Sequence, residues 1–577
     1  MMRSPRRLVV VVVLTLAAFG AAACSGSSTR HSTTVSTNPA PASTTSPAAT
    51  AGSSVSTTAA PVSTSAPTKR PATSTVVPAS TTTNAPIADR PLRAGAQRLH
   101  FELGPIDITP GQNNIDFSRR AIPQPTVDGY IVRIAPNLRL EDQTIPAVDV
   151  IHLHHGVWLN LSAPDATSPI LRERFFAAGE EKTAMELPDG YGYSYHTTDK
   201  WLLNYMIHNL WPNETKVWIT YDIDLIPADN AAAASIQPAR PVWTDVQNGS
   251  AYPVFDVLKG SGTNGAYTYP DDAKQPYDGT PKNAWTVDHD GVLVATAGHL
   301  HPGGLHNDLW LRRAGAVAPT GHAKQGAADT AHLFSSIANY WEPAGAVSWD
   351  VAMTATPTTW RVAVHTGDVL STTATYDSAR ASWYESMGIM VVWMADKPAA
   401  AESTAADPFA VAVDVAGELT HGHLAENDHH GGAVDTRYHD LTQAPSIAAT
   451  PTIGIGDFSY AQGDLLVASN VPTIAPGAAI TFDNADAPLG NGEWHTITAC
   501  KAPCTSSTGI AFPLADGDTV FDSGQLGTGG PPTADRTTWT TPTDLQPGTY
   551  TYFCRIHPFM RGAFRVSTSA AAAEALT

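Results

Sequence analysis

Between residues 99 and 397, short segments alternate apolar and polar positions with the period of two that is typical of β-strands. Examples are VDVIHLHHGVWLNL, KVWITYDIDLIP and WRVAVHTGDVLSTTATY, and Pro, Gly, Asn and Asp separate such runs. These separators favour turns and interrupt strands. Stretches with the 3.6-residue period of a helix are scarce. The pattern predicts an all-β chain, with room for two β-sandwiches before residue 397.

Breaks in this pattern give the expected domain boundaries. The segment DNAAAASIQPARP loses strand character, so we place one boundary at residue 232, between sandwiches of residues 93–232 and 233–397. Residues 398–450 are rich in Ala, Asp and His and are predicted to be a linker. Strand-like alternation returns in residues 451–568, which we expect to form a third domain, and residues 569–577 are expected to be a disordered tail.

The N-terminal region has the pattern of an export signal followed by a spacer. Residues 1–23 join an arginine-containing start to the apolar run LVVVVVLTLAAFG. The following Cys24 stands where a bacterial lipoprotein carries its lipid, and an ordinary secretory signal cut near Ala23 is the alternative. Residues 24–92 are mostly Ser, Thr, Ala and Pro, so we expect a disordered stalk. We therefore expect an exported protein, held at the cell membrane only by a lipid anchor or else secreted.

Charge and cysteine content narrow the partners. The net charge is −19 and the sequence has no basic stripe, which argues against nucleic acid as a partner. Only four cysteines occur. Two of them, Cys500 and Cys504, stand close together in TACKAPC. We expect a local disulfide there in an exported protein, with metal binding by the pair as the alternative.

The stretch GTYTYFCRIHPFMR contains the most specific chemical pattern of the chain. Cys554, His557 and Met560 lie between two strand-like runs, and His495 lies on a strand-like segment upstream. A thiolate, imidazoles and a thioether form a soft ligand set that suits copper in an electron-transfer site. A structural zinc site, the simplest alternative, would have no use for the methionine.

The order of a strand with His, a long loop, a strand with Cys-x-x-His-x-x-Met and a final strand resembles the cupredoxins, most closely amicyanin and plastocyanin. The resemblance covers roughly residues 455–567. It implies a Greek-key β-barrel or sandwich with one type 1 copper. The implied ligands are His495, Cys554, His557 and Met560.

Histidines also recur on the predicted strands of the sandwiches. Residues i and i+2 of a strand share a face. His152 and His154 should therefore point together, with His155 on the other face unless the strand twists or bulges. His299 and His301 form a second pair of this kind, which is a common way to build two corners of a metal site.

The order of these pieces is similar to that of the type II copper, ascorbate-dependent monooxygenases, which include peptidylglycine α-hydroxylating monooxygenase and dopamine β-monooxygenase. The shared pieces are ITPGQNNIDF, a His-His pair, GYGYSYHTTDKWLLNYMIHN, HLH, GDVLSTTATYDS and a methionine-bearing strand. The resemblance is distant and spans roughly residues 98–397. It implies two jelly-roll-like β-sandwiches with one type II-like copper in each.

The resemblance also implies a role for each ligand set. The first copper, which relays electrons, would be bound by His154, His155 and His208. The second copper, where O₂ is reduced and a substrate C–H bond is hydroxylated, would be bound by the catalytic set His299, His301 and Met387. Two alternatives remain open: Met390 as the third ligand of the second copper, and His152 in place of one ligand of the first.

Departures from the family change the expected substrate. Ala297 stands where peptide-amidating enzymes hold the substrate carboxylate with an arginine, and Ile389 and Val391 replace their substrate-binding Asn and Tyr. A glycine-extended peptide is therefore not expected. An apolar pocket near Met387 would suit a small or neutral substrate, or none.

The sequence thus predicts an exported copper monooxygenase that uses O₂ and a small-molecule substrate. A fused blue-copper domain would be the electron donor, and the linker would raise its effective concentration. A separate redox partner protein is also compatible with the chain. The alternative is a non-enzymatic extracytoplasmic protein for copper binding or electron transfer. A histidine-rich stretch in the linker fits either hypothesis: His421, His423, His429 and His430.

Overall fold

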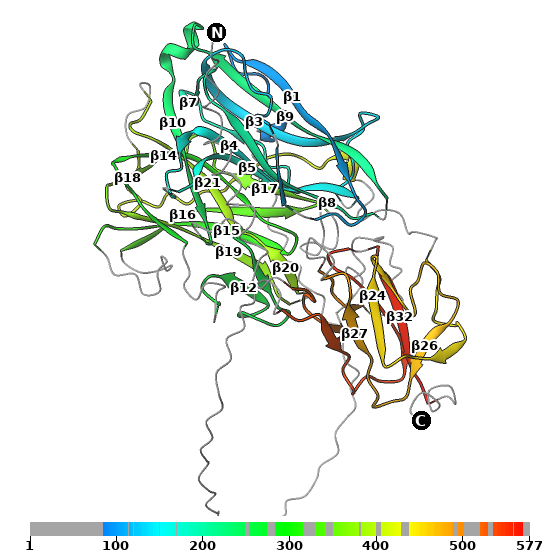
Figure 1. The fold of residues 1–577 in the computed structure, drawn as a ribbon. Helices are drawn as coiled ribbons and strands as arrows, with labels where there is room; N and C mark the ends of the chain where they lie inside the picture. The colour runs from blue at the N-terminus through cyan, green and yellow to red at the C-terminus, as the bar shows by residue number, and fades with distance from the viewer. Residues whose placement is uncertain are drawn as a thin grey trace, which may run out of the picture. The chain divides into compact units, whose positions relative to one another are not determined.

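The structure is a computed structural model (Figure 1). It describes residues 85–568 except 114, 119, 149, 169, 212, 248–252, 274–282, 316–328, 342–349, 380–381, 400–404, 428–437, 488–493, 501–519, 529–534 and 558. The predicted signal, Cys24, Cys504 and the tail lie outside these residues, and the side chain of Cys500 is not described either. The lipid anchor and the disulfide therefore stay predictions. No helix of the described chain is long and apolar enough to cross a membrane.

Nearly all regular structure in the described chain is β, which confirms the predicted all-β class of two jelly-roll-like sandwiches followed by a cupredoxin. The first sandwich consists of two antiparallel sheets. One contains β1 (Gln97–Ile108), β9 (Thr215–Pro227), β3 (Gly129–Leu140), β7 (Tyr191–Tyr195) and β6 (Met185–Glu186). The other contains β2 (Ile115–Phe117), β8 (Trp201–Asn209), β4 (Ile151–Pro164) and β5 (Arg172–Gly179).

The second sandwich continues the first sheet, because β7 pairs in parallel with β10 (Gln237–Asp245). The short 3₁₀ helix η2 (Ala231–Ser235) precedes β10 and lies at the expected boundary. The path then follows β21 (Ile389–Ala395), β14 (Gly291–His299), β17 (Val351–Ala355), β16 (Thr330–Tyr340), β15 (Gly304–Arg312), β19 (Val369–Asp377) and β12 (Ala266–Tyr269). The flanking strands are β13 (Ala284–Thr286), β18 (Val362–Val364), β22 (Glu418–Leu419) and the pair β11 (Phe255–Val257) and β20 (Trp383–Ser386).

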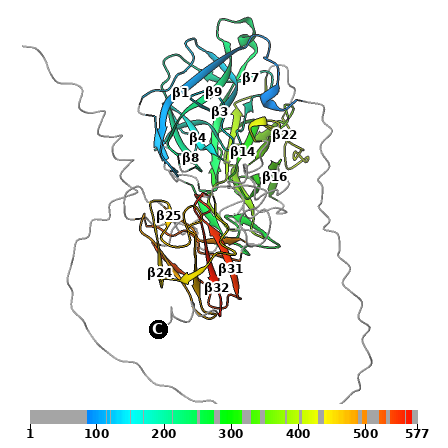
Figure 2. The ribbon, with the colours of Figure 1, turned by 90° about the vertical axis from the view of Figure 1, so that its right-hand side faces the viewer.

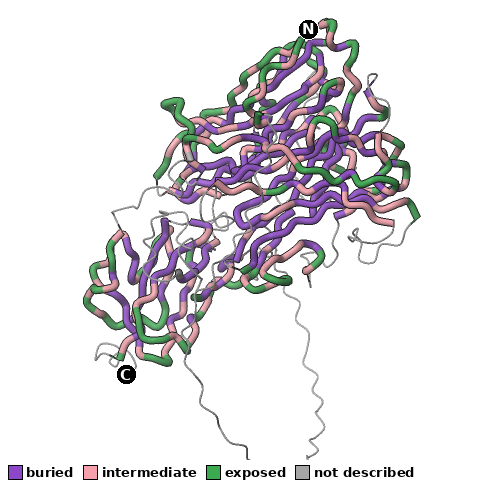
Figure 3. The backbone as a smooth tube through the Cα atoms, turned by 180° about the vertical axis from the view of Figure 1, so that it is seen from behind, coloured by how far each residue is buried: buried purple, intermediate pink, exposed green. Residues whose placement is uncertain are grey.

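Strand β21 shows why the two sandwiches are tightly joined. All seven of its residues are buried, as expected for a strand covered on both faces. Ile389, Val391 and Trp393 pack into the core that contains the first sandwich. Met390 and its i+2 neighbours pack on the opposite side, into the core of the second sandwich. The run IMVVWMA therefore separates two hydrophobic cores. Figure 3 shows the buried residues in purple.

The cupredoxin domain packs two sheets around one aromatic core. One sheet contains β23 (Ser446–Ala448), β26 (Val471–Ile474), β32 (Arg561–Val566), β31 (Gly548–Phe553), β28 (Thr498–Cys500) and β29 (Phe521–Asp522). The other contains β25 (Ser459–Tyr460), β24 (Thr452–Gly456), β27 (Thr481–Asn484) and β30 (Thr538–Thr540). Figure 2 shows β31 and β32 side by side, and they are an antiparallel pair.

Two segments expected to be irregular are partly folded. The end of the predicted stalk contains η1 (Ile87–Asp89), whose Ile87 is buried, and Arg90 pairs with Glu186 at 2.9 Å. In the predicted linker, β22 pairs with β17, and a further 3₁₀ helix, η4, spans Ala425–Asn427. Buried apolar and paired charged side chains among the polar residues explain why composition alone misjudged both boundaries.

Candidate metal centres

The first centre lies at the end of β31, in the loop that returns to β32. The amide of Cys554 donates to the carbonyl of Met560 at 3.0 Å, and the amide of Met560 donates to the carbonyl of His557 at 2.8 Å. These bonds close the loop, so that three predicted ligands come from one tight turn. His495 comes from an upstream segment of the domain, where it forms an isolated antiparallel β-bridge with Leu526.

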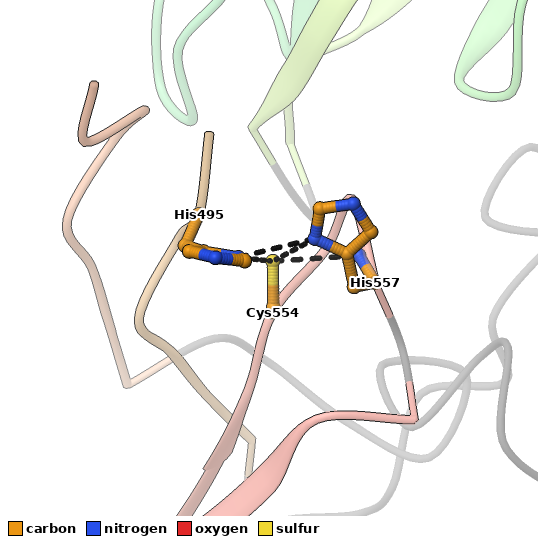
Figure 4. Close-up of side chains that lie close together, drawn as sticks. All are labelled: His495, Cys554 and His557. Atoms are coloured by element: carbon orange, nitrogen blue, oxygen red, sulfur yellow. Dashed lines mark hydrogen bonds between the residues drawn. The ribbon is translucent and has the colours of Figure 1, made fainter. Parts of the chain in front are cut away.

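Three of the predicted ligands converge on one point (Figure 4). The Sγ atom of Cys554 lies 3.8 Å from Nδ1 of His495 and 3.7 Å from Nδ1 of His557, and the two nitrogens are 3.1 Å apart. Atoms bound to one ion with bonds of about 2.0–2.3 Å lie roughly 3–4 Å apart. All three side chains are fully buried, and Met560 is buried in the same cluster. The donor set therefore fits the single copper expected for this domain.

Neighbouring groups fix the orientation and charge of this centre. Nε2 of His495 lies 2.9 Å from Oδ2 of Asp486, whose other oxygen accepts from the amide of Asp457 at 2.8 Å. Burial alone would lower the pKa of His495, but Asp486 and Cys554 together raise it to about 9. The amides of Thr496 and His557 both lie 3.4 Å from Sγ of Cys554. Such contacts orient metal ligands and tune the metal they hold.

The second centre begins at a bulge in β4. His152 lies opposite His208 of β8, and the register then shifts between Leu153 and His155. One extra residue in β4 changes which side chains face the partner strand. The sequence predicted that His155 would point away from His152 and His154 unless the strand twisted or bulged, and the structure contains such a bulge. All four histidines are at least 95% buried: His152, His154, His155 and His208.

Histidines of the two sandwiches meet in one cluster. The ring centroids of His154 and His301 are 4.0 Å apart, and those of His154 and His208 are 5.8 Å apart. Nε2 of His299 lies 3.2 Å from Nε2 of His301. The two predicted ligand sets, one from each sandwich, therefore lie next to each other. The cause is the packing of β14 and β21 against β5, which places the end of β14 over the first sandwich.

Glycine makes this close approach sterically feasible. A Cβ atom on Gly179, the last residue of β5, would lie 2.2 Å from the carbonyl oxygen of His154 and 2.7 Å from Cε1 of His299. Both distances are shorter than real Cβ contacts, and one of them is to rigid backbone. A side chain at this position would push the two sandwiches apart at the cluster.

Two carboxylates that the sequence analysis missed belong to this centre. One oxygen of Glu180 lies within 4.8 Å of a nitrogen of His154 and a nitrogen of His301. Burial and the neighbouring Glu181 raise the pKa of Glu180 well above its usual value, and neither of its oxygens accepts a hydrogen bond from another described residue. Oε2 of Glu181 contacts Nδ1 of His299 at 3.0 Å. A Glu-Glu pair directly after the apolar run FFAAG was the available signal.

The cluster favours neutral imidazoles. Burial, helped by the charge of His299, lowers the pKa of His155 to about 3. Burial also lowers the pKa of His208 to about 4, although a bond to the carbonyl of Ile556 opposes this. At neutral pH these rings are unprotonated, which is the form that binds metals.

The two methionines considered as ligands, Met387 and Met390, lie in different cores. Met387 is buried in the core that contains the first sandwich, and Tyr376 holds its backbone by donating to its carbonyl at 2.7 Å. Met390 faces the opposite core, so the structure contradicts it as an alternative ligand beside His299. Met185 lines a small apolar cavity of about 20 Å³ next to His299. This cavity is about the size that holds one water molecule.

Linker histidines fall into two groups. His421 is buried, and its two ring nitrogens each lie 2.6 Å from a main-chain carbonyl oxygen, that of Gly422 and that of Glu181. His423 contacts Asp350 at 3.0 Å. His429 and His430 lie outside the described residues. In this arrangement His421 supports the glutamate loop of the second centre and does not join a histidine-rich metal store.

The two centres are in direct contact. Nε2 of His208 donates to the carbonyl of Ile556, which lies between two ligands of the first centre, at 2.7 Å. The ring centroids of His208 and His557 are 6.3 Å apart. On the second sandwich, Tyr384 donates to Asp522 at 2.7 Å. The cupredoxin domain is therefore packed against the sandwiches as well as joined to them by the predicted linker.

Comparisons with solved structures include partial matches to two copper proteins. No protein-family model and no curated protein matches the chain. A purple cupredoxin from Nitrosopumilus maritimus aligns over 98% of its length and 20% of this chain, at 22% identity and a TM-score of 0.13. A copper-containing nitrite reductase from Thermus scotoductus aligns over 59% of its length and 49% of this chain, at 12% identity and a TM-score of 0.15. At such TM-scores neither match carries an argument about function.

Proposed function

We propose that the protein is a copper oxidoreductase in which the cupredoxin domain supplies electrons to the buried histidine–glutamate centre. The observation that carries this proposal is the 2.7 Å hydrogen bond from His208 to the carbonyl of Ile556. Ile556 stands between Cys554 and His557, and His208 belongs to the second centre. One hydrogen bond thus links the ligand loop of one centre to a ligand candidate of the other.

The residues of each centre have complementary tasks. Copper, when bound, supplies reversible one-electron transfer at the first centre and reaction with a small oxidant at the second. His495, Cys554, His557 and Met560 would hold the ion of the first centre. Asp486 orients His495, and complete burial excludes water from the ligands. In the second centre, Glu181 orients His299 in the same way.

The finer proposal is hydroxylation of a C–H bond with O₂. This reaction consumes two electrons and two protons per O₂ and leaves one oxygen atom in the product and one in water. The resemblance to the type II copper monooxygenases supports it. The apolar cavity beside His299, lined also by Ile389 and Val391, has room for about one water-sized molecule, which supports access by O₂. We also propose that the protein is exported from the cytoplasm, either with a lipid at Cys24 or in secreted form. A separate redox partner protein would supply electrons from outside.

The test follows the oxidation of chemically reduced, copper-loaded protein by O₂. We expect the blue absorption of the first centre to return while O₂ is consumed. His299→Ala should abolish O₂ consumption and leave the blue colour of the oxidised protein intact. His196→Gln, at an exposed position of the first sandwich, is the matched control and should behave like the parent. Full O₂ consumption by His299→Ala would contradict the proposal.

A second candidate function is copper storage or delivery without catalysis. It is favoured by the burial of all six histidines of the second centre, none of which exceeds 5% exposure. This candidate predicts tight copper binding and no O₂ consumption with any reductant. The same experiment on the parent protein therefore separates the two functions.

A further inference from the structure

We infer that the second centre is a single composite site for two metal ions, built by both sandwiches, and that Glu180 is the carboxylate they share. This inference rests on the proposed function, because it concerns the same buried residues. It differs from the sequence expectation of two separated mononuclear coppers. Its donors are His152, His154, His155, His208, His299, His301 and Glu180.

The number of donors exceeds what one ion uses. Metal ions with imidazole and carboxylate ligands usually take three or four protein donors in such sites. Six imidazoles and one carboxylate make seven donors, all at least 95% buried. A carboxylate buried as deeply as Glu180, with no hydrogen bond from another described residue, is costly unless something binds it. One ion would leave at least three of these groups unused.

Three histidines are oriented as metal ligands usually are. His299 uses Nδ1 for Glu181, His208 uses Nε2 for the carbonyl of Ile556, and His152 uses Nδ1 for the carbonyl of Val148. Ligating histidines commonly donate one ring nitrogen to a carboxylate or a carbonyl, which presents the other ring nitrogen to the metal. The supports come from three separate elements, so the orientation is not a property of one strand.

The distances divide the donors into two overlapping groups. His152 and His208 have ring centroids 5.2 Å apart, and each lies within 5.9 Å of His154. On the other side, the facing nitrogens of His299 and His301 are 3.2 Å apart, which fits two ligands of one ion. His154 and His301, with centroids 4.0 Å apart, connect the groups. The donors therefore form one continuous site with two ends.

Glu180 lies at the connection. One of its oxygens is within 4.8 Å of both His154 and His301, which belong to opposite ends. Neither oxygen accepts a hydrogen bond from another described residue, although the side chain is 2% exposed. A carboxylate has two oxygens and can bind one ion through each. Ions in two-metal sites lie about 3.5–4 Å apart, close enough for their unpaired electrons to interact.

The test combines copper analysis with quantitative EPR on the full chain carrying Cys554→Ser, which removes the blue centre from the spectrum. We expect about two coppers per chain and a spin count well below the copper count, or a half-field signal from an interacting pair. Glu180→Gln in the same background should retain at most one copper per chain. His196→Gln should retain both. Circular dichroism, and the blue absorption of Glu180→Gln with Cys554 present, show whether that variant folds.

Other outcomes overturn the inference in distinguishable ways. Two coppers with a full count of independent type II spins, or a single copper per chain, would overturn the shared site and leave the proposed function standing. Unchanged copper content and spectrum in Glu180→Gln would remove Glu180 from the site. No copper in Cys554→Ser would defeat the proposed function together with the inference.

Discussion

The two centres are built in opposite ways. The cupredoxin centre takes Cys554, His557 and Met560 from one turn closed by two backbone hydrogen bonds, and only His495 comes from elsewhere. The histidine–glutamate centre draws on four strands or strand ends of two sandwiches: β4, β8, the end of β5 and β14. The first centre depends on a local loop. The second exists only where two domains pack together, and a single glycine at residue 179 permits the contact.

The centres also differ in how their charge is balanced. In the first, Cys554 provides a sulfur ligand that two amides approach at 3.4 Å. In the second, the oxygens of Glu180 accept no hydrogen bond from another described residue, and burial raises the pKa of Glu180, so its negative charge needs a cation nearby. Loss of metal should therefore leave the cupredoxin loop satisfied and the sandwich cluster strained.

The largest expected effect is loss of copper binding of the blue type at one centre with no change at the other. Cys554→Ser removes the sulfur ligand, so we expect total loss of the blue absorption and unchanged metal binding by the sandwich cluster. Absorption spectroscopy and metal analysis measure the two parts. Loss of metal from both centres would show that they are not independent binding sites.

The orienting carboxylates allow a matched pair of substitutions. Asp486→Asn and Glu181→Gln each weaken the partner of one histidine, at 2.9 Å and 3.0 Å respectively. Loss of such a partner typically costs about 10- to 100-fold in metal affinity. We expect each substitution to lower copper affinity at its own centre only, as measured by competition with a chelator. Equal losses at both centres in either variant would contradict the assignment.

The two centres also differ in how far the sequence predicts them. The first centre was predictable because the spacing of Cys554, His557 and Met560 encodes the turn itself. The histidines of the second centre were found from strand periodicity, but their grouping was not. It depends on a bulge in β4 and on β21 separating two cores, which are consequences of packing between distant segments.

Glu180 and Glu181 were missed for a related reason. Acidic residues at a strand end are usually solvated, and only the tertiary structure shows these two buried under the histidines. The linker was misjudged because its composition is polar, whereas β22 fastens it to the second sandwich and the buried His421 contacts Glu181 of the first.

A smaller effect tests the contact between the first sandwich and the cupredoxin domain. Gly111 has φ of 64°, and a Cβ there would lie 2.5 Å from the ring of Phe458 in the cupredoxin domain. Gly111→Ala should cost about 1–2 kcal/mol from backbone strain, plus the clash. Gly260→Ala is the control, with φ of 79° and nothing within 4 Å of its Cβ. We expect a lower Tm for Gly111→Ala than for the control. Equal Tm values would mean that the Gly111–Phe458 contact adds nothing to stability.

The smallest expected effect is a pH dependence of stability that arises in β20, a strand of the second sandwich that contacts the cupredoxin domain. Burial raises the pKa of Glu385, in β20, to about 8. Because this value lies above the ordinary glutamate pKa of the unfolded chain, its contribution to stability is complete below that ordinary pKa, falls as the pH rises toward 8 and is fully lost above 8. Glu385→Gln should therefore raise Tm more at pH 9 than at pH 5. A constant difference between the variants at both pH values would contradict the burial argument.

Internal electron transfer is the most direct test of the central claim that the cupredoxin domain feeds the histidine–glutamate centre. A pulse of reductant applied to oxidised, copper-loaded protein without O₂ should bleach the blue absorption, which should then recover in a first-order step. We expect the recovery rate to be independent of protein concentration, and we expect no recovery in His154→Ala. A blue centre that stays bleached, or a rate that rises in proportion to protein concentration, would contradict it.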